Sequence, residues 1–209
     1  MIRISPDDFY RIIIGVDPAL TSGDDADETG IIVVASGPHQ PDTCSIPTCT
    51  MHGYVLEDAT PPKTNKNSVN LWVNTVVEKF DQWDASLVVV EDNAGRELLD
   101  MALRTVRPDL PVKRPNATEG KKARAEPIVA LYEQGRVHHV GPPEHFAQLE
   151  EQMTTWVPKE NGGRKDRSPD RVDALVWGLA ELNLQGRKPR RTALDIAPVG
   201  FGQRNVWSL

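Results

Sequence analysis

Residues 11–17 read RIIIGVD, and this stretch decides the fold that the sequence predicts. Its unbroken apolar run is typical of a strand that is buried on both faces at the centre of a sheet. Asp17 ends the run, so an acidic side chain is expected at the carboxyl end of a central strand. Pro18 follows directly, and an acid before a proline is also a common start for a turn. A structural and a functional interpretation of Asp17 therefore both stay open.

The hydrophobic pattern on the carboxyl side of this strand predicts an alternation of strands and helices. Further strands are expected at 31–35, 52–57, 86–92, 111–114 and 137–140, and helices at 68–83, 96–107, 121–134, 145–156 and from 168 to about 184. The short connection between the first two strands favours antiparallel neighbours. The first three strands are expected to form an antiparallel meander, and a right-handed crossover then lays the fourth strand parallel to the first. The sequence thus predicts an α/β fold with a mixed central sheet, in which three antiparallel strands are followed by parallel strands and helices flank the sheet.

A second acid is expected at the same edge of the sheet as Asp17. The stretch SLVVVED, residues 86–92, is another buried strand and ends in Glu91 and Asp92. Because side chains alternate along a strand, one of these two acids faces the site and the other faces away. If the first and fourth strands are neighbours, Asp17 and the inward-facing acid lie close together.

A third acid lies in SPDRVDALVW, residues 168–177. Ser168 can cap a helix, and Asp170 has a sufficient structural reason to stand in the first turn. Asp173 is expected beyond the first turn, at the edge of the apolar stripe of the helix, and no Lys or Arg follows or precedes it at helical spacing. A helix that packs on the sheet through this stripe would bring Asp173 to the acids at the strand ends.

Carboxylates that are gathered in a partly buried place disfavour one another's ionisation, and divalent cations remove this conflict. Carboxylate oxygens suit Mg²⁺ or Mn²⁺, and two such ions about 4 Å apart can clamp the attacking and leaving oxygens of a phosphodiester. The candidate metal ligands and catalytic residues are Asp17, Glu91 and Asp173, with Asp170 as a further metal ligand one turn before Asp173. A noncatalytic module, in which the acids hold a structural ion, is an alternative.

The motifs in this order resemble the C-terminal nuclease domain of phage terminase large subunits. The resemblance spans about residues 11–182 and rests on GVDPA, ETGIIVV, VVVEDNAGRE, KARAEPIVALYEQGRVHH, LEEQMTTW and SPDRVDALVWGL. It implies a ribonuclease H-like fold and an endonuclease that cuts concatemeric viral DNA during genome packaging. It also implies that Asp17 bridges two metal ions, that Glu91 and Asp173 complete the site, and that Asp170 occupies a position that binds metal in some relatives.

The distribution of charge is compatible with a DNA partner, although the formal net charge is −6. Two basic clusters are candidates for contacts with DNA phosphates, namely Lys121, Lys122 and Arg124, and Arg164, Lys165 and Arg167. The first cluster also matches a segment of the family that is suited to the DNA backbone. For each cluster the alternative is a solvated charged surface.

The resemblance further implies partners that this chain does not contain. A full large subunit carries an ATPase domain, and no G-x-x-x-x-G-K-[ST] motif is present here, so we expect no ATP hydrolysis. The implied partners are double-stranded DNA, the ATPase domain of the same subunit, the small terminase subunit and the portal protein. No membrane contact is expected, and the implied location is the bacterial host cytoplasm, docked at the procapsid. We expect residues 1–185 to form the nuclease domain and residues 186–209 to be a flexible tail.

Three other interpretations are weaker. A Holliday-junction resolvase shares the fold and the metals but cuts a branched substrate. An actin-like or sugar-kinase ATPase domain shares the opening strands, but the glycine of its phosphate turn is missing after Asp17. A zinc site built from His39, Cys44, Cys49 and His52 matches no common finger spacing, so an ordinary loop is expected there.

Overall fold

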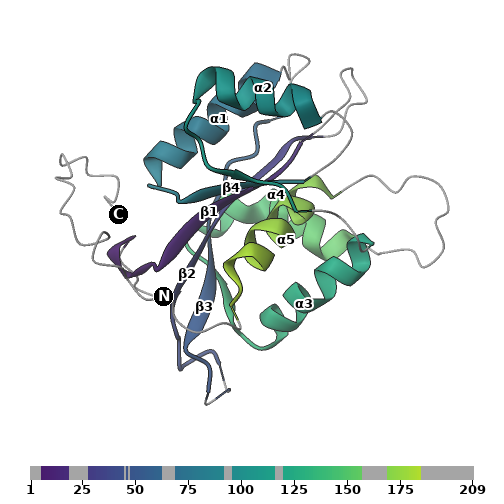
Figure 1. The fold of residues 1–209 in the computed structure, drawn as a ribbon. Coiled ribbons are helices and arrows are strands. Elements are labelled where there is room, and N and C mark those ends of the chain that lie inside the picture. The colour runs from purple at the N-terminus through teal and green to yellow at the C-terminus, as the bar shows by residue number, and fades with distance from the viewer. Residues whose placement is uncertain are drawn as a thin grey trace.

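In a computed structural model, the described part of the chain forms a six-stranded sheet between two layers of helices (Figure 1). The structure describes residues 6–18, 28–44, 46, 48–62, 69–91, 96–115, 120–156 and 169–184. The strands are β1 (Arg11–Asp17), β2 (Gly30–Pro38), β3 (Met51–Asp58), β4 (Leu87–Val90), β5 (Val112–Lys113) and β6 (Val137–His139). The helices are α1 (Val69–Gln82), α2 (Arg96–Val106), α3 (Lys121–Glu133), α4 (Ala147–Thr155) and α5 (Asp170–Leu182), with 3₁₀ turns at Pro6–Asp8 and Pro143–Phe146.

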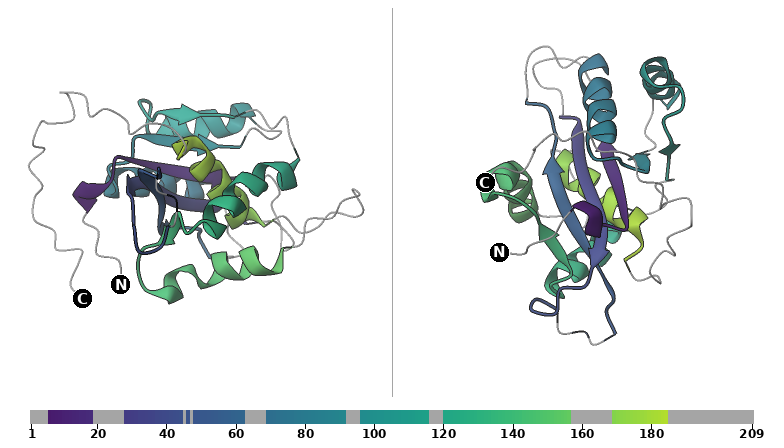
Figure 2. Two further views of the ribbon diagram at one scale, coloured as in Figure 1. Left: turned by 90° about the horizontal axis from the view of Figure 1, so that it is seen from below. Right: turned by 90° about the vertical axis from the view of Figure 1, so that its left-hand side faces the viewer.

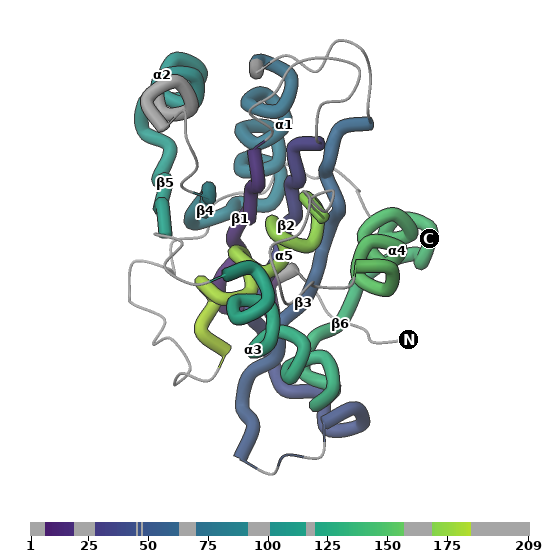
Figure 3. Tube along the Cα trace, turned by 90° about the vertical axis from the view of Figure 1, so that its right-hand side faces the viewer, coloured from purple at the N-terminus to yellow at the C-terminus, as the bar shows by residue number. Residues whose placement is uncertain are grey.

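The strand order is β5-β4-β1-β2-β3-β6, so β1 lies inside the sheet as its apolar sequence predicted. Strands β1, β2 and β3 form an antiparallel meander, and β4 lies parallel to β1 on the other side. The predicted mixed sheet is therefore confirmed. Strand β6 adds to the outer edge of β3 in a parallel orientation, and β5 forms the opposite edge (Figure 3).

Helices α1 and α2 cover one face of the sheet, and α3, α4 and α5 cover the other (Figure 2). Alternating side chains of β1 serve the two layers. Ile14 and Val16 pack with α1 and α2, whereas Ile13 packs with α5. This burial on both faces explains why residues 11–16 show no polar alternation.

Helix α5 lies unusually close to the backbone of β1 and β2. A Cβ atom added at Gly15 would lie 2.1 Å from the carbonyl oxygen of Ala174, and one at Gly30 would lie 2.1 Å from that of Asp170. On the helix itself, a Cβ at Gly178 would lie 2.8 Å from Val34 Cγ2. These glycines leave room for the helix backbone, so the first turn of α5 rests directly on the ends of β1 and β2.

The start of α5 differs from the expectation. The helix begins at Asp170 with Pro169 in the capping position, and no side chain caps it. The expected cap, Ser168, lies outside the described residues. Asp173 belongs to the first turn, and its backbone N–H donates to the carbonyl of Pro169 at 2.9 Å, so the prediction that it lies beyond that turn was wrong. Both acids therefore benefit from the positive end of the helix dipole.

Several predicted features fall on residues that the structure does not describe. These are the acid Asp92, the basic cluster of Arg164, Lys165 and Arg167, and the tail from residue 186 onward. Among the described helices, none is both long enough and apolar enough to cross a membrane.

Candidate active site

Parallel pairing of β1 and β4 sets Asp17 beside Glu91. Val16 pairs with Val90, and the N–H of Glu91 donates to the carbonyl of Val16 at 3.1 Å. The two acids therefore leave neighbouring strands at the same end of the sheet. Both are buried, with 5% of Asp17 and 4% of Glu91 exposed. The sequence left open whether Glu91 or Asp92 lies beside Asp17. The structure places Glu91 there, at the buried end of the two central strands.

The first turn of α5 adds two more buried acids to this edge. Asp170 and Asp173 are buried, and the close contact of α5 with Gly15 and Gly30 carries them to the end of β1. We call Asp17, Glu91, Asp170 and Asp173 the acid cluster. The structure thus brings together all four acids that the sequence singled out as metal ligands.

The electrostatics of Asp17 reflect this crowding. Burial and the negative charges of Asp173, Glu91 and Asp170 together raise the pKa of Asp17 to about 9, although the charge of Lys121 opposes the shift. At neutral pH the metal-free protein therefore holds a proton on Asp17. A cation that binds among these carboxylates would replace this proton.

Two basic side chains of α3 point toward the acid cluster. Lys121 Nζ donates to Asp173 Oδ2, and Arg124 Nη2 donates to Glu91 Oε1 at 3.3 Å. The guanidinium of Arg124 also lies over the ring of Trp177, 4.5 Å from its centroid. Burial disfavours the charged form of Lys121, but the hydrogen bond and charge of Asp173 outweigh this effect, so its pKa is raised.

These contacts refine the predicted DNA-binding set. Lys121 and Arg124 lie against the acids, whereas Lys122 is exposed on the surface of α3. The side chain of Lys121 is 41% exposed, so it reaches from the surface into the cluster. Contact of these residues with DNA stays a prediction, as does that of the second basic cluster.

The side chains of the acid cluster are of the type that binds divalent cations. Glu91 Oε2 is buried and has no hydrogen-bond partner within the described part of the chain. The ammonium group of Lys121 pairs with Asp173, so the acid cluster already attracts one positive charge within the chain. Carboxylate oxygens are hard ligands, which suit Mg²⁺ or Mn²⁺ better than softer metals.

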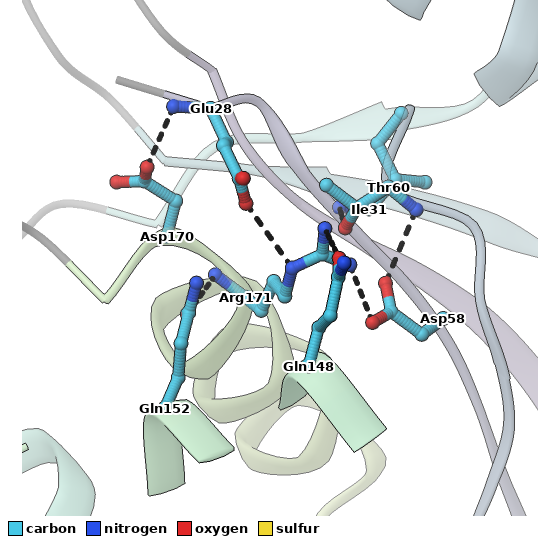
Figure 4. Close-up of polar contacts among 8 residues, drawn as sticks. All are labelled: Glu28, Ile31, Asp58, Thr60, Gln148, Gln152, Asp170 and Arg171. Atoms are coloured by element: carbon cyan, nitrogen blue, oxygen red, sulfur yellow. Dashed lines mark hydrogen bonds and ion pairs between the residues drawn. The ribbon is translucent and has the colours of Figure 1, made fainter. Parts of the chain in front are cut away.

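The sequence did not reveal a buried basic side chain on α5 (Figure 4). Arg171 is 3% exposed and reaches Glu28 at 3.1 Å, Asp58 at 2.5 Å and Gln148 at 2.5 Å. Its backbone N–H donates to Gln152 Oε1 at 3.0 Å. We call these five residues the arginine network. It ties the start of α5 to the beginning of β2, the end of β3 and α4.

The arginine network also contacts one member of the acid cluster. Asp170 Oδ2 accepts a hydrogen bond from the backbone N–H of Glu28 at 2.8 Å, next to the contact of Glu28 with Arg171 (Figure 4). One sequence signal could have revealed the network. Arg171 stands at the start of a helix whose apolar stripe reads as core, and a guanidinium buried there requires acidic partners.

The comparisons with known proteins agree with this architecture. The family described as the terminase RNaseH-like domain matches residues 14–182. Among solved structures, the large terminase nuclease from thermophilic phage G20c is similar, with a TM-score of 0.52 and 15% identity over 82% of each chain. RuvC from Thermus thermophilus gives a TM-score of 0.43 and 16% identity, over 84% of this chain and 97% of RuvC. No curated protein matches the sequence. The family match and the likeness to the phage nuclease confirm the predicted ribonuclease H-like fold.

Proposed function

Because this chain belongs to the terminase RNaseH-like domain family, we propose that it is a metal-dependent endonuclease that cuts concatemeric viral DNA during genome packaging. The observation that carries the proposal is the convergence of Asp17, Glu91 and Asp173. These side chains come from β1, the end of β4 and α5, and all three are buried at one edge of the sheet. A cluster of this kind is costly for stability alone, since each carboxylate disfavours the ionisation of the others.

In this proposal, Asp17, Glu91 and Asp173 hold two divalent cations, Mg²⁺ or Mn²⁺, with Asp170 as a further ligand. When bound, such ions supply charge stabilisation to the attacking and leaving oxygens of a phosphodiester. The carboxylates must be ionised for this role, so Asp17 releases its proton when the ions enter. Arg124 orients Glu91 through their hydrogen bond and is itself held against Trp177.

The proposed reaction is hydrolysis of double-stranded DNA. A water oxygen forms a bond to phosphorus in line with the leaving group, and the bond from phosphorus to the 3′ oxygen breaks. Lys122, together with Lys121 and Arg124, would contact backbone phosphates, and Arg164, Lys165 and Arg167 would extend this contact. Phosphate contacts carry no base information, so the domain itself would cut with little sequence preference.

The proposed setting follows from the family. The nuclease domain, residues 1–185, would act beside the ATPase domain of the same large subunit, the small terminase subunit and the portal protein. This places its work in the bacterial host cytoplasm, at the procapsid. Residues 186–209 would be a flexible tail of the domain.

Plasmid cleavage tests this function. The chain is incubated with supercoiled plasmid and with linear duplex in Mn²⁺, Mg²⁺ or EDTA, beside the variants Asp173→Asn and Asp109→Asn. The side chain of Asp109 is 78% exposed, so its variant is a matched control for removing a carboxylate. We expect the parent and the control to cut both substrates with a cation, and the Asp173 variant to cut neither. Failure of the parent to cut either DNA with any cation would contradict the proposal.

A further inference from the structure

The connection between β2 and β3 carries a second group of metal-ligating side chains, His39, Cys44, Cys49 and His52. Each offers one ligand atom, and these atoms all lie within 4.8 Å of one another. We propose that these four side chains, the histidine–cysteine cluster, bind one structural zinc ion. The ordinary loop expected from the finger spacing does not account for this convergence.

Strand pairing, not the spacing of the residues along the chain, brings the two histidines together. In the β2–β3 pair, Pro38 lies opposite Met51 and Gly37 lies opposite His52. His39 directly follows β2, so both imidazoles emerge at the same end of the hairpin. Their ring centroids are 5.0 Å apart and the rings meet edge to face. The two cysteines then come from the loop that this hairpin closes.

The histidines present unused nitrogen atoms. Among the described residues, His39 Nε2 and His52 Nε2 are buried without any hydrogen-bond partner, and no part of His52 is exposed. A buried acceptor without a partner is destabilising, and a metal ion that takes its lone pair removes this penalty. Both unpartnered atoms belong to the four-residue cluster, which is independent support for a ligand there.

A neighbouring histidine lies where it can support the tautomer that metal binding requires. His52 Nδ1 lies 2.7 Å from His138 Nε2, on β6. If His52 Nδ1 carries the proton and donates it to His138, the lone pair of His52 Nε2 is free for a metal. Zinc-bound histidines usually make such a bond through their other nitrogen.

The donor set selects zinc. Cys44 is buried, Cys49 is partly buried, and both are free thiols in the structure. Two sulfur and two nitrogen donors are typical of tetrahedral structural zinc, whose bonds of about 2.0–2.3 Å set neighbouring donors roughly 3.3–3.8 Å apart. The cluster needs a contraction on the order of 1 Å to reach that geometry. The same donors are too soft for Mg²⁺.

The zinc would pin a loop far from the acid cluster. Gly30, which pairs with Asp17, and Pro38 stand at opposite ends of β2, about 27 Å apart at the rise of a strand. Near the cluster, Thr43 Oγ1 donates to the carbonyl of Gly135 at 3.2 Å, in the turn between α3 and β6. With four protein ligands the site is closed to substrate, so its role is to hold the hairpin loop against this turn.

Metal analysis of the purified chain tests the proposal. After dialysis against metal-free buffer, plasma mass spectrometry should find about one zinc per chain. Cys44→Ser and Cys49→Ser should lower the zinc content at least tenfold, whereas the exposed His145→Ala should not. Asp17→Asn should also keep its zinc, which separates this site from the acid cluster and from the outcome of the nuclease test.

A second readout does not depend on variants that fold poorly. The parent chain loaded with Co²⁺ in place of zinc should show the visible absorption of a tetrahedral thiolate site, and EDTA should speed thiol modification of both cysteines. A parent chain without zinc and without this Co²⁺ spectrum would overturn the proposal. A Cys44–Cys49 disulfide in protein purified under reducing conditions would also overturn it.

Discussion

The first turn of α5 contributes to two groups of charged side chains, and the two groups balance their charges in different ways. On one side, the guanidinium of Arg171 meets the carboxylates of Glu28 and Asp58 and the amide of Gln148. On the other side, the acid cluster concentrates like charges that Lys121 and Arg124 offset only in part, because burial and the acidic neighbours still raise the pKa of Asp17 to about 9. Arg171 and the four acids of the cluster are all buried, and both groups use the same helix turn.

The difference between the two groups indicates that one stabilises the fold and the other serves function. A buried charge that has found its partners within the chain needs no ligand, and its loss leaves the partners uncompensated. A buried group of like charges gains stability when a cation binds, so it is arranged for a ligand. We therefore expect the arginine network to govern folding and the acid cluster to govern metal binding and cleavage.

The largest effect is expected from the acid cluster. Asp17→Asn and Asp173→Asn should each slow plasmid cleavage in Mn²⁺ by about 1,000-fold, because metal-derived charge stabilisation is worth several kcal/mol. Initial cleavage rates measure this loss, and circular dichroism should show a retained fold. If a variant cuts at the parental rate, its residue does not belong to the active site, and the acid cluster does not govern cleavage as we expect.

The next effect concerns the arginine network. Arg171→Met should destabilise the protein by about 3–5 kcal/mol, because it leaves the buried carboxylate of Asp58 and the partly buried carboxylate of Glu28 without their cation. Urea unfolding measures the loss. Lys113→Met is the control, since the Lys113 side chain is 54% exposed and its ion pair with Glu181 is worth about 0.5 kcal/mol. Equal losses in the two variants would contradict the assignment of Arg171 to stability.

Asp17 should also set the pH dependence of the metal-free protein. Its pKa rises from 3.8 to about 9 on folding, so the folded state binds an extra proton between these values. Stability should therefore fall as the pH rises through this window, by about 1 kcal/mol for each pH unit, which corresponds to about 2–4 °C in Tm. Asp17→Asn should flatten the trend in thermal melts with EDTA. A parental Tm that rises from pH 5 to pH 8 would contradict the raised pKa.

The smallest effect is expected at Asp170. One of its oxygens already accepts the N–H of Glu28 at 2.8 Å, so it has less capacity for metal than Asp173. Asp170→Asn keeps an oxygen for this hydrogen bond and should slow cleavage by about tenfold, or about 1.4 kcal/mol. A loss as large as that of Asp173→Asn would show that Asp170 contributes as much to the site as Asp173 does.

The features of the protein that could be predicted from the sequence are those encoded in local stretches of the chain. The apolar run before Asp17, the similar run before Glu91 and the apolar stripe of α5 each fix an element and its buried face. Once β1 and β4 are parallel neighbours, the meeting of Asp17 and Glu91 follows from strand geometry. The apolar stripe of α5 pointed to Asp173 as a third acid, the resemblance to the terminase family implied the same role, and the family match confirms the resemblance.

What escaped prediction depends on contacts between distant segments. Glu28 lies 143 positions before Arg171, and neither sequence neighbourhood shows the need for the other. The basic residues Lys121 and Arg124 looked like surface contacts for DNA, but the packing of α3 turns them toward Asp173 and Glu91. The histidine–cysteine cluster was judged by its spacing along the chain, whereas its convergence is produced by the pairing of β2 with β3.

Diffraction from crystals of the chain soaked in Mn²⁺ shows directly whether the acid cluster binds metal ions, because anomalous scattering locates the ions without any assay of cleavage. The account predicts anomalous peaks within about 2.5 Å of carboxylate oxygens of Asp17, Glu91 and Asp173. Well-diffracting soaked crystals with no peak at these three side chains would contradict it.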